Sequence, residues 1–207
     1  MKKLLLTLLS ISLFSAATSA QMRFGIKGGL NLANISVSPA QSNPPKSIIG
    51  FHGGVVLDAA LTDKISIQPN LLFSLKGASG SVSIGTGTIE SKATLNYIEV
   101  PVNFVYSVTD AFTVGAGPYL GYALSGNSAV TSTITGFSSY NESLDFEKEK
   151  VKRLDFGLNF TAGYEVTEGI VISANYSLGL ANTSDDANVT SKNNVIGFSV
   201  TKFFGEK

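Results

Sequence analysis

Few residues in this chain are of the types that carry out acid–base or nucleophilic chemistry. The chain has one histidine, His52, and no cysteine. Serines are abundant, but none lies in a G-x-S-x-G elbow that would present a nucleophile. A serine hydrolase needs a base within hydrogen-bonding reach of its serine. Because a single histidine is more often structural, we expect no enzymatic activity.

Acidic residues cluster in one polar segment, where Glu142, Asp145 and Glu147 could supply oxygen ligands to Ca²⁺. Lysines such as Lys148 and Lys150 are interleaved with them, which favours a solvated loop over a metal site. No other His, Asp or Glu residues have the spacing of metal ligands. The sequence therefore predicts no metal and no other cofactor.

The remaining charged residues alternate with apolar ones. Between Ile98 and Tyr106, even positions are apolar while Glu99 and Asn103 occupy odd positions. A period of two is typical of a strand with one apolar and one polar face. The same pattern predicts eight strands, at about residues 22–32, 49–61, 64–76, 92–107, 112–124, 154–164, 170–180 and 193–204.

The connections between these strands alternate in length. Short turns are predicted at 62–63, 108–111 and 167–169. The other connections are long and polar, at 33–48, 77–91, 125–150 and 181–192. Outer-membrane barrels have this layout, with short turns in the periplasm and long loops outside. We predict an all-β protein whose single domain, residues 21–207, is an eight-stranded antiparallel up-and-down transmembrane β-barrel.

The polar faces of the strands carry a balanced set of ionisable residues. Closing the barrel turns this face inward, and eight strands leave room only for side chains. Ionised groups confined there must pair or be hydrated. We therefore predict a lumen filled by a mutually neutralising polar network; a polar conduit is the alternative. Its members are Arg23, Lys27, His52, Asp58, Lys76, Glu99, Arg153, Asp155 and Glu165.

The apolar faces carry aromatic residues near both ends of the strands. Two aromatic bands match the two interfaces of a membrane. A soluble, lipocalin-like barrel with an apolar cavity is the alternative, but charged residues make up only 14 % of the chain. The predicted girdles are Phe24, Tyr106, Phe112, Tyr164 and Phe204 toward the short turns, and Phe51, Phe73, Tyr122, Phe156 and Tyr176 toward the long loops.

Three prolines do not fit regular strands. Pro69, Pro101 and Pro118 lie inside predicted strands, and a closed barrel has no free edge to accommodate them. Each lacks a backbone N–H and must interrupt a ladder. We expect a bulge or irregular pairing at each position.

The first twenty residues have the layout of a secretory signal. Lys2 and Lys3 precede an apolar run, and small residues end the segment at Ala20. The apolar run is shorter than the roughly 20 residues that a spanning helix needs. We predict residues 1–20 to be a signal peptide, cleaved before Gln21, and the protein to be exported to the cell outer membrane.

Short motifs along the chain resemble a known family. Residues 25–32 (GIKGGLNL) resemble the first strand of PorT-like outer-membrane β-barrel proteins, and residues 97–102 (YIEVPV) resemble their central Tyr-x-Glu-x-Pro motif. Residues 115–121 and 155–157 are similar to later strands of that family. The resemblance implies a small barrel of Gram-negative outer membranes, related in shape to OmpA-type and OmpX-type barrels.

These features lead to expectations about function. We expect a structural or interaction role through the outer loops, chiefly 33–48 and 125–150. The alternatives are a narrow pore for small solutes and a lipid-modifying enzyme. Expected partners are outer-membrane lipid and a protein that contacts the loops. With 15 basic and 15 acidic residues, nothing points to nucleic acid, and we expect a monomer.

Overall fold

The structure, a computed structural model, describes residues 22–40 and 43–205. The proposed signal peptide therefore lies outside the described residues. The strands are β1 (Met22–Ser38), β2 (Ile48–Ala60), β3 (Ile65–Ile84), β4 (Gly87–Ser107), β5 (Phe112–Ser132), β6 (Tyr140–Ser143), β7 (Leu154–Thr167), β8 (Ile170–Gly179) and β9 (Thr190–Phe204).

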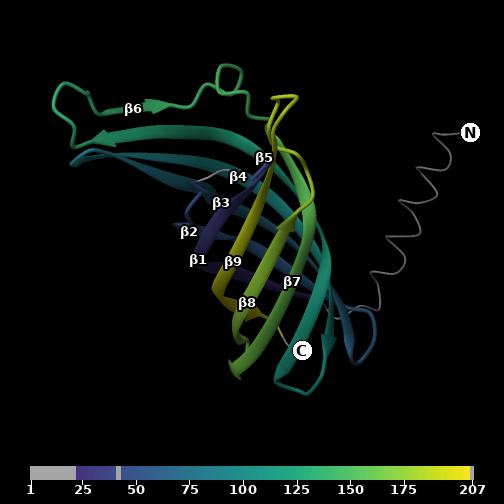
Figure 1. Ribbon diagram of the computed structural model, residues 1–207. Helices are drawn as coiled ribbons and strands as arrows, with labels where there is room; N and C mark the ends of the chain where they lie inside the picture. The colour runs from purple at the N-terminus through teal and green to yellow at the C-terminus, as the bar shows by residue number, and fades with distance from the viewer. Residues whose placement is uncertain (1–21, 41–42, 206–207) are drawn as a thin grey trace, which may run out of the picture.

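Eight of these strands form a closed antiparallel ring (Figure 1). The order is β4-β3-β2-β1-β9-β8-β7-β5, and pairing of β4 with β5 closes it. The first and last strands are neighbours, with Phe24 opposite Phe204. The short strand β6 pairs only with β5, outside the ring. The predicted eight-stranded up-and-down barrel is confirmed.

Side chains alternate between the two faces of each strand, as β9 shows. Ser199 and Thr201 are buried, whereas Phe198 and Val200, which alternate with them, are 62 % and 54 % exposed. The closed sheet therefore has a polar interior and an apolar exterior. This is the inverse of a soluble domain and the arrangement that a lipid environment requires.

The two ends of the barrel differ. Tight turns join β2 to β3, β4 to β5 and β7 to β8 at one end, here called the turn end. Side chains stabilise two of these turns: Thr62 Oγ1 accepts a hydrogen bond from the Ile65 N–H (3.0 Å), and Thr109 Oγ1 from the Phe112 N–H (2.9 Å). The long connections lie at the opposite end, here called the loop end.

Three strands continue past the loop end. The predicted loop at 77–91 is wrong: most of it is a hairpin in which β3 and β4 stay paired up to Ile84 and Gly87. Gly85 in its turn has φ of 61°, a conformation that glycine adopts without steric cost. The strand β5 likewise continues to Ser132. With β6, these extensions form a projecting sheet, here called the arm (Figure 1).

The three prolines interrupt pairing without shifting it. In the β2–β3 ladder, pairs are absent between Val56↔Asn70 and Ala59↔Ile67, a stretch that includes Pro69. Similar gaps adjoin Pro101 and Pro118 in the β4 ladders, and the register is the same on both sides of each gap. Irregular pairing is thus confirmed. Of the two predicted forms, irregular pairing occurs and not a bulge, because losing one donor opens a ladder without inserting a residue.

Candidate functional site

An ionic cluster lies inside the barrel toward the loop end, built around Lys76 on β3. The Lys76 Nζ is 2.5 Å from Glu99 Oε1 on β4 and 2.9 Å from Asp155 Oδ2 on β7. It also lies 5.0 Å from the centroid of the Tyr97 ring and 4.7 Å from that of Tyr119. Lys76 is 1 % exposed and Asp155 fully buried, so each ion depends on the others for its charge compensation.

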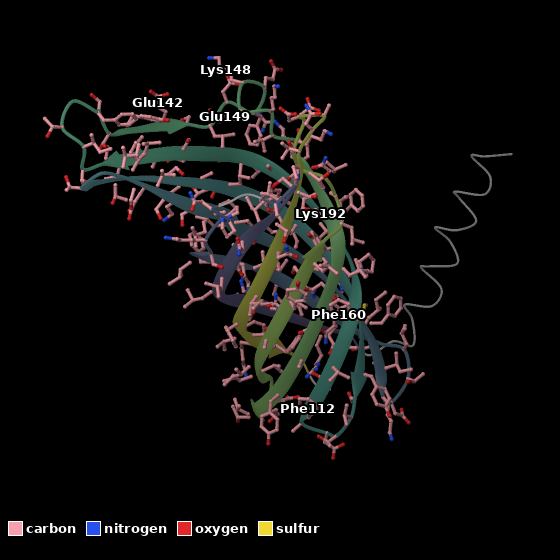
Figure 2. The ribbon with its side chains drawn as sticks, in the orientation of Figure 1. Phe112, Glu142, Lys148, Glu149, Phe160 and Lys192 are labelled. Carbon is pink, nitrogen blue, oxygen red and sulfur yellow. The ribbon has the colours of Figure 1, made fainter. Side chains whose placement is uncertain are left out.

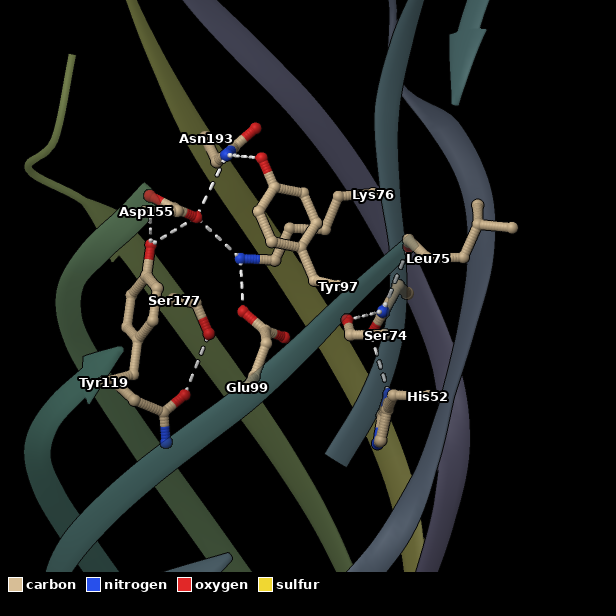
Figure 3. Close-up of polar contacts among 12 residues, drawn as sticks. His52, Ser74, Leu75, Lys76, Tyr97, Glu99, Tyr119, Asp155, Ser177 and Asn193 are labelled. Carbon is tan, nitrogen blue, oxygen red and sulfur yellow. Dashed lines mark hydrogen bonds and ion pairs between the residues drawn. The ribbon is translucent and has the colours of Figure 1, made fainter. Parts of the chain in front are cut away.

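Hydrogen bonds extend this cluster across the lumen (Figure 3). The Tyr119 hydroxyl lies 3.3 Å from both oxygens of Asp155, and Asn193 Nδ2 donates to Asp155 Oδ2 at 3.0 Å. Asn193 also reaches the Tyr97 hydroxyl, at 3.4 Å. The participants, Lys76, Tyr97, Glu99, Tyr119, Asp155 and Asn193, come from five of the eight ring strands. They are here called the Lys76 cluster, and together they fill the cross-section.

A second ion pair lies near the turn end. Arg23 Nη2 is 2.8 Å from Asp58 Oδ2, and Gln68 Nε2 donates to the other Asp58 oxygen at 3.1 Å. Glu165 Oε1 is 3.9 Å from Arg23 Nη1 and accepts a hydrogen bond from the Gly169 N–H. Arg23 also lies over the Phe203 ring. One arginine therefore neutralises carboxylates from β2 and β7.

His52 lies between these two groups in a chain of three side chains. Its Nδ1 is 2.7 Å from Asn31 Oδ1, and its Nε2 is 2.7 Å from Ser199 Oγ. Asn31 Nδ2 donates to Ser74 Oγ, so Asn31 Oδ1 is the acceptor facing His52. The neutral histidine then donates from Nδ1 and accepts the Ser199 proton at Nε2. Gly29 makes room for the ring, since a Cβ there would lie 2.8 Å from His52 Cε1.

This Ser199–His52–Asn31 order matches the groups of a hydrolytic triad, and the sequence analysis missed it. Positions 31, 52 and 199 are distant in sequence, and only the β1–β2 and β1–β9 pairing brings them together. Ser199 is 3 % exposed. The space beside His52 measures about 30 Å³, room for about one or two water molecules. Because Ser199 is almost fully buried and does not line this space, the geometry supports a structural relay.

Two predicted network members differ from the rest. Arg153, just before β7, lies 3.7 Å over the Phe146 ring and donates to the carbonyl oxygens of Ala123 and Leu124. Its side chain turns toward the rim of the barrel, where these two carbonyl oxygens and the Phe146 ring hold it. Lys27 points inward but contacts no carboxylate among the described residues. The inner face therefore carries three cations and four carboxylates, not four of each: Arg23, Lys27 and Lys76 against Asp58, Glu99, Asp155 and Glu165.

Comparison with known families identifies the class of barrel. The family model described as "Outer membrane protein beta-barrel domain" matches residues 15–185, most of the chain. The chain belongs to this outer-membrane β-barrel family. Its localisation is accordingly the outer membrane. Among the residues that the structure describes, no helix is long and apolar enough to span a membrane.

Several solved outer-membrane proteins are similar to this chain at low sequence identity, and one of them has a TM-score above 0.5. Neisserial surface protein A is 12 % identical with a TM-score of 0.51, over 87 % of this chain and 97 % of that one. Ail of Yersinia pestis is 14 % identical with a TM-score of 0.41, over 87 % and 99 %. OprG of Pseudomonas aeruginosa is 14 % identical with a TM-score of 0.39, over 90 % and 98 %. Comparison with curated proteins finds no match.

The exterior of this outer-membrane barrel carries the aromatic residues predicted as girdles. Phe24 and Phe204 stack at 6.3 Å near the turn end, and Phe51 and Phe73 lie 6.0 Å apart nearer the loop end. All ten side chains are exposed except Phe73, which is half-buried. Figure 2 shows Phe112 near the turn end and charged side chains such as Lys148 at the loop end.

A loop covers the mouth of the outer-membrane barrel at the loop end. Phe146 is buried against Leu95, Tyr97 and Ala123, directly above the Lys76 cluster. The segment 144–153 is here called the lid, and its residues up to 150 were predicted to be part of a solvated loop. The charged residues of the lid other than Arg153 are exposed. The apolar residues Leu144, Phe146 and Val151 among them indicate a buried face, but the many charges obscured this signal.

The lid is tied to the connection between β8 and β9. Val151 forms a β-bridge with Ser184. Lys150 Nζ is 3.4 Å from Asp186 Oδ2, and Lys152 Nζ is 3.5 Å from Asp185 Oδ1. The Asn188 N–H bonds to Asp186 and, with Lys150, holds the pKa of that carboxyl below its ordinary value. These contacts join two loops that are about 36 residues apart in sequence.

Proposed function

We propose that the protein is a closed outer-membrane barrel that acts through its loop end, as a structural element or by binding a protein partner. The observation that carries this proposal is the Lys76 cluster. It joins five strands across the lumen and lies beneath the buried Phe146 of the lid. The Lys76 cluster and the lid close the lumen one above the other. The arm and the outer side of the lid are therefore the surfaces available for contact with a partner.

The orientation and processing of the chain belong to the same proposal. Short turns of such barrels face the periplasm, so the arm lies outside the cell. Residues 1–20 are removed as a signal peptide after export. The aromatic girdles contact the interfacial regions of the lipid, and the protein is a monomer. The motif order at 25–32 and 97–102 supports placement in the PorT-like branch.

Conductance distinguishes this proposal from a narrow pore. We expect the purified protein to give near-zero conductance in a planar bilayer, and Glu99→Ala to leave it unchanged because the lid still covers the mouth. A variant lacking residues 144–150 and carrying Tyr97→Ala, Glu99→Ala and Tyr119→Ala removes the lid and most of the bulk of the Lys76 cluster, and should conduct. Stable single-channel steps from the unaltered protein would contradict the closed barrel.

Cross-linking tests the interaction role. Residues 133–143, which include β6, are replaced by a Gly–Ser linker that leaves the lid intact. Cross-linking on whole cells should yield a defined adduct with the unaltered protein and lose it with this variant. A matched variant carries the same linker at 108–111, in a periplasmic turn, and should keep the adduct. Equal adducts from both variants would place the contact elsewhere.

We propose no catalytic role. A lipid-modifying barrel needs its nucleophile and base where lipid can reach them, whereas Ser199 and His52 are 3 % and 6 % exposed and face the lumen. Overexpression should therefore leave the mass spectrum of lipid A unchanged, with or without His52→Ala. A new lipid A species that disappears in the His52→Ala variant would contradict this.

A further inference from the structure

The half of the barrel nearest the turn end contains a cavity of about 560 Å³, here called the vestibule. Residues of the β2–β3 turn, including Lys64, lie at its mouth. Its inner part reaches Lys27, beyond which the lumen narrows to the space of about 30 Å³ beside His52. The Lys76 cluster then closes the barrel. Any solute in the vestibule must therefore enter and leave at the turn end.

Three hydrogen-bond donors share one wall of the vestibule. Lys27 on β1 is directly opposite Thr201 on β9 in the ladder. Ser173 on β8 is the diagonal neighbour of Thr201, since Thr201 pairs with Val171. Directly opposed residues on one face have Cβ atoms about 5 Å apart, and diagonal ones about 7–8 Å. Lys27, Ser173 and Thr201 thus form one group, here called the donor patch.

The side chains of the donor patch have no hydrogen-bond or ion-pair partner among the residues that the structure describes. Among residues 22–40 and 43–205, none forms a hydrogen bond or ion pair with the side chains of Lys27, Ser173 or Thr201. All three border the vestibule, and the two hydroxyl-bearing residues are 7 % and 4 % exposed. The other inner cations, Arg23 and Lys76, both contact carboxylates. An ammonium away from bulk water needs a compensating anion or hydration.

We propose that the vestibule binds a small solute through a carboxylate group held by the donor patch. One ammonium and two hydroxyls match the charge and the acceptor oxygens of a monoanionic carboxylate. Asp58 and Glu165 also line the vestibule and are already neutralised in part by Arg23. These acidic groups disfavour a doubly charged anion. The volume lies within the range of small-molecule sites, roughly 300–1,000 Å³.

The proposal is tested by NMR titration of the folded, ¹⁵N-labelled protein in maltoside micelles at pH 6.5. Sodium acetate is the probe, with sodium chloride adjusted to keep ionic strength constant. We expect saturable shifts of the Lys27, Ser173 and Thr201 amides. Inorganic sulfate, a dianion at this pH, should bind more weakly than acetate at the same total concentration.

Variants assign the site. Lys27→Met keeps the length of the side chain and should raise the apparent Kd for acetate at least about tenfold, as expected for losing one charge-assisted hydrogen bond. Thr201→Val should raise the Kd for acetate several-fold. If Lys27→Met does not fold, the Kd of Thr201→Val is the test of the site. Lys64→Met removes a cation at the mouth of the vestibule and should leave the Kd unchanged.

Three results would overturn the proposal. The first is a linear, non-saturating response of the unaltered protein to acetate. The second is an unchanged Kd in folded Lys27→Met or, where that variant does not fold, in Thr201→Val. The third is tighter binding of sulfate than of acetate, which would exclude a site selective for monoanionic carboxylates.

Discussion

Lys76 on β3 and Asp155 on β7 form a 2.9 Å ion pair inside the barrel, although 79 positions separate them in the sequence. Glu99 lies on the other side of the same ammonium. One cation thus neutralises two carboxylates in a place where bulk water does not reach. The cluster holds distant strands at a fixed separation and closes the lumen at the same time.

Lys76→Met should destabilise the barrel strongly, because it leaves Glu99 and Asp155 buried without their cation. Breaking a buried pair from one side costs about 3–5 kcal/mol of unfolding free energy. The triple variant Lys76→Met, Glu99→Gln, Asp155→Asn should recover much of this loss. Urea unfolding in vesicles, followed by the gel mobility of folded and unfolded forms, measures both. Equal urea midpoints for the unaltered protein and Lys76→Met would show that the cluster contributes no stability.

Ser199→Ala should lower the unfolding free energy by about 1 kcal/mol, the usual net contribution of a buried hydrogen bond. It removes the donor to His52 Nε2 and leaves that nitrogen unpaired. The unaltered protein should not react with a fluorophosphonate, since Ser199 is buried. Ser143→Ala on the exposed strand β6 is the control for stability and should change nothing. Labelling at Ser199, located by peptide mass spectrometry, would argue for catalysis instead of a structural relay.

Val200→Arg should destabilise the protein in lipid because Val200 is exposed on the outer wall, between Phe198 and Phe204 along β9. An arginine on the lipid face costs about 2–4 kcal/mol at the membrane midplane and less near the interfaces. Ser143→Arg, outside the barrel wall, should be neutral. The comparison uses urea unfolding in vesicles. A neutral Val200→Arg would contradict the membrane assignment of this wall.

The lid should loosen in acid. The pKa of Asp186 is lowered by the Asn188 N–H and by Lys150, so folding favours its ionised form. That stabilisation is present at pH values above the ordinary carboxyl pKa of about 3.9 and is lost as pH falls through the lower folded value. Protease cleavage within 144–153 by an acid-active enzyme should rise between pH 5 and pH 2.5 more than the intrinsic activity of that enzyme changes.

Asp186→Asn provides the control for the acid response. This variant should already be more readily cleaved at pH 5, because it keeps the turn geometry but loses the charge facing Lys150. Its further increase at pH 2.5 should be smaller than that of the unaltered protein. An identical pH response of the two proteins would assign the loosening to other loop carboxylates, such as Asp145, whose pKa is also lowered by backbone N–H groups.

Much of the fold follows from local sequence pattern. Alternation such as that around Ile98 and Glu99 predicts a strand with two unlike faces, and loop lengths predict an up-and-down order. Both the alternation and the loop lengths are local properties of the sequence, so they can be read without knowing which strands pair. The arm was missed because its strands are rich in serine and carry few large apolar residues, such as Val82 and Ile84. Their pairing, seen at Ser83 opposite Thr88, depends on neighbouring backbone and not on burial.

The composition of the lumen was predictable, but its contacts were not. Parity along each strand places Lys76, Glu99 and Asp155 on the inner face, and pattern alone determines that. The register and stagger of the closed ring determine which charged side chains come into contact. They do so because they set the position of every side chain along the barrel axis. The ring brought Lys76 to Asp155, joined His52 to Asn31 and Ser199, and left Lys27 facing an open vestibule. Sequence thus determined which groups are inside, and only closure of the sheet decided which of them remain without a partner.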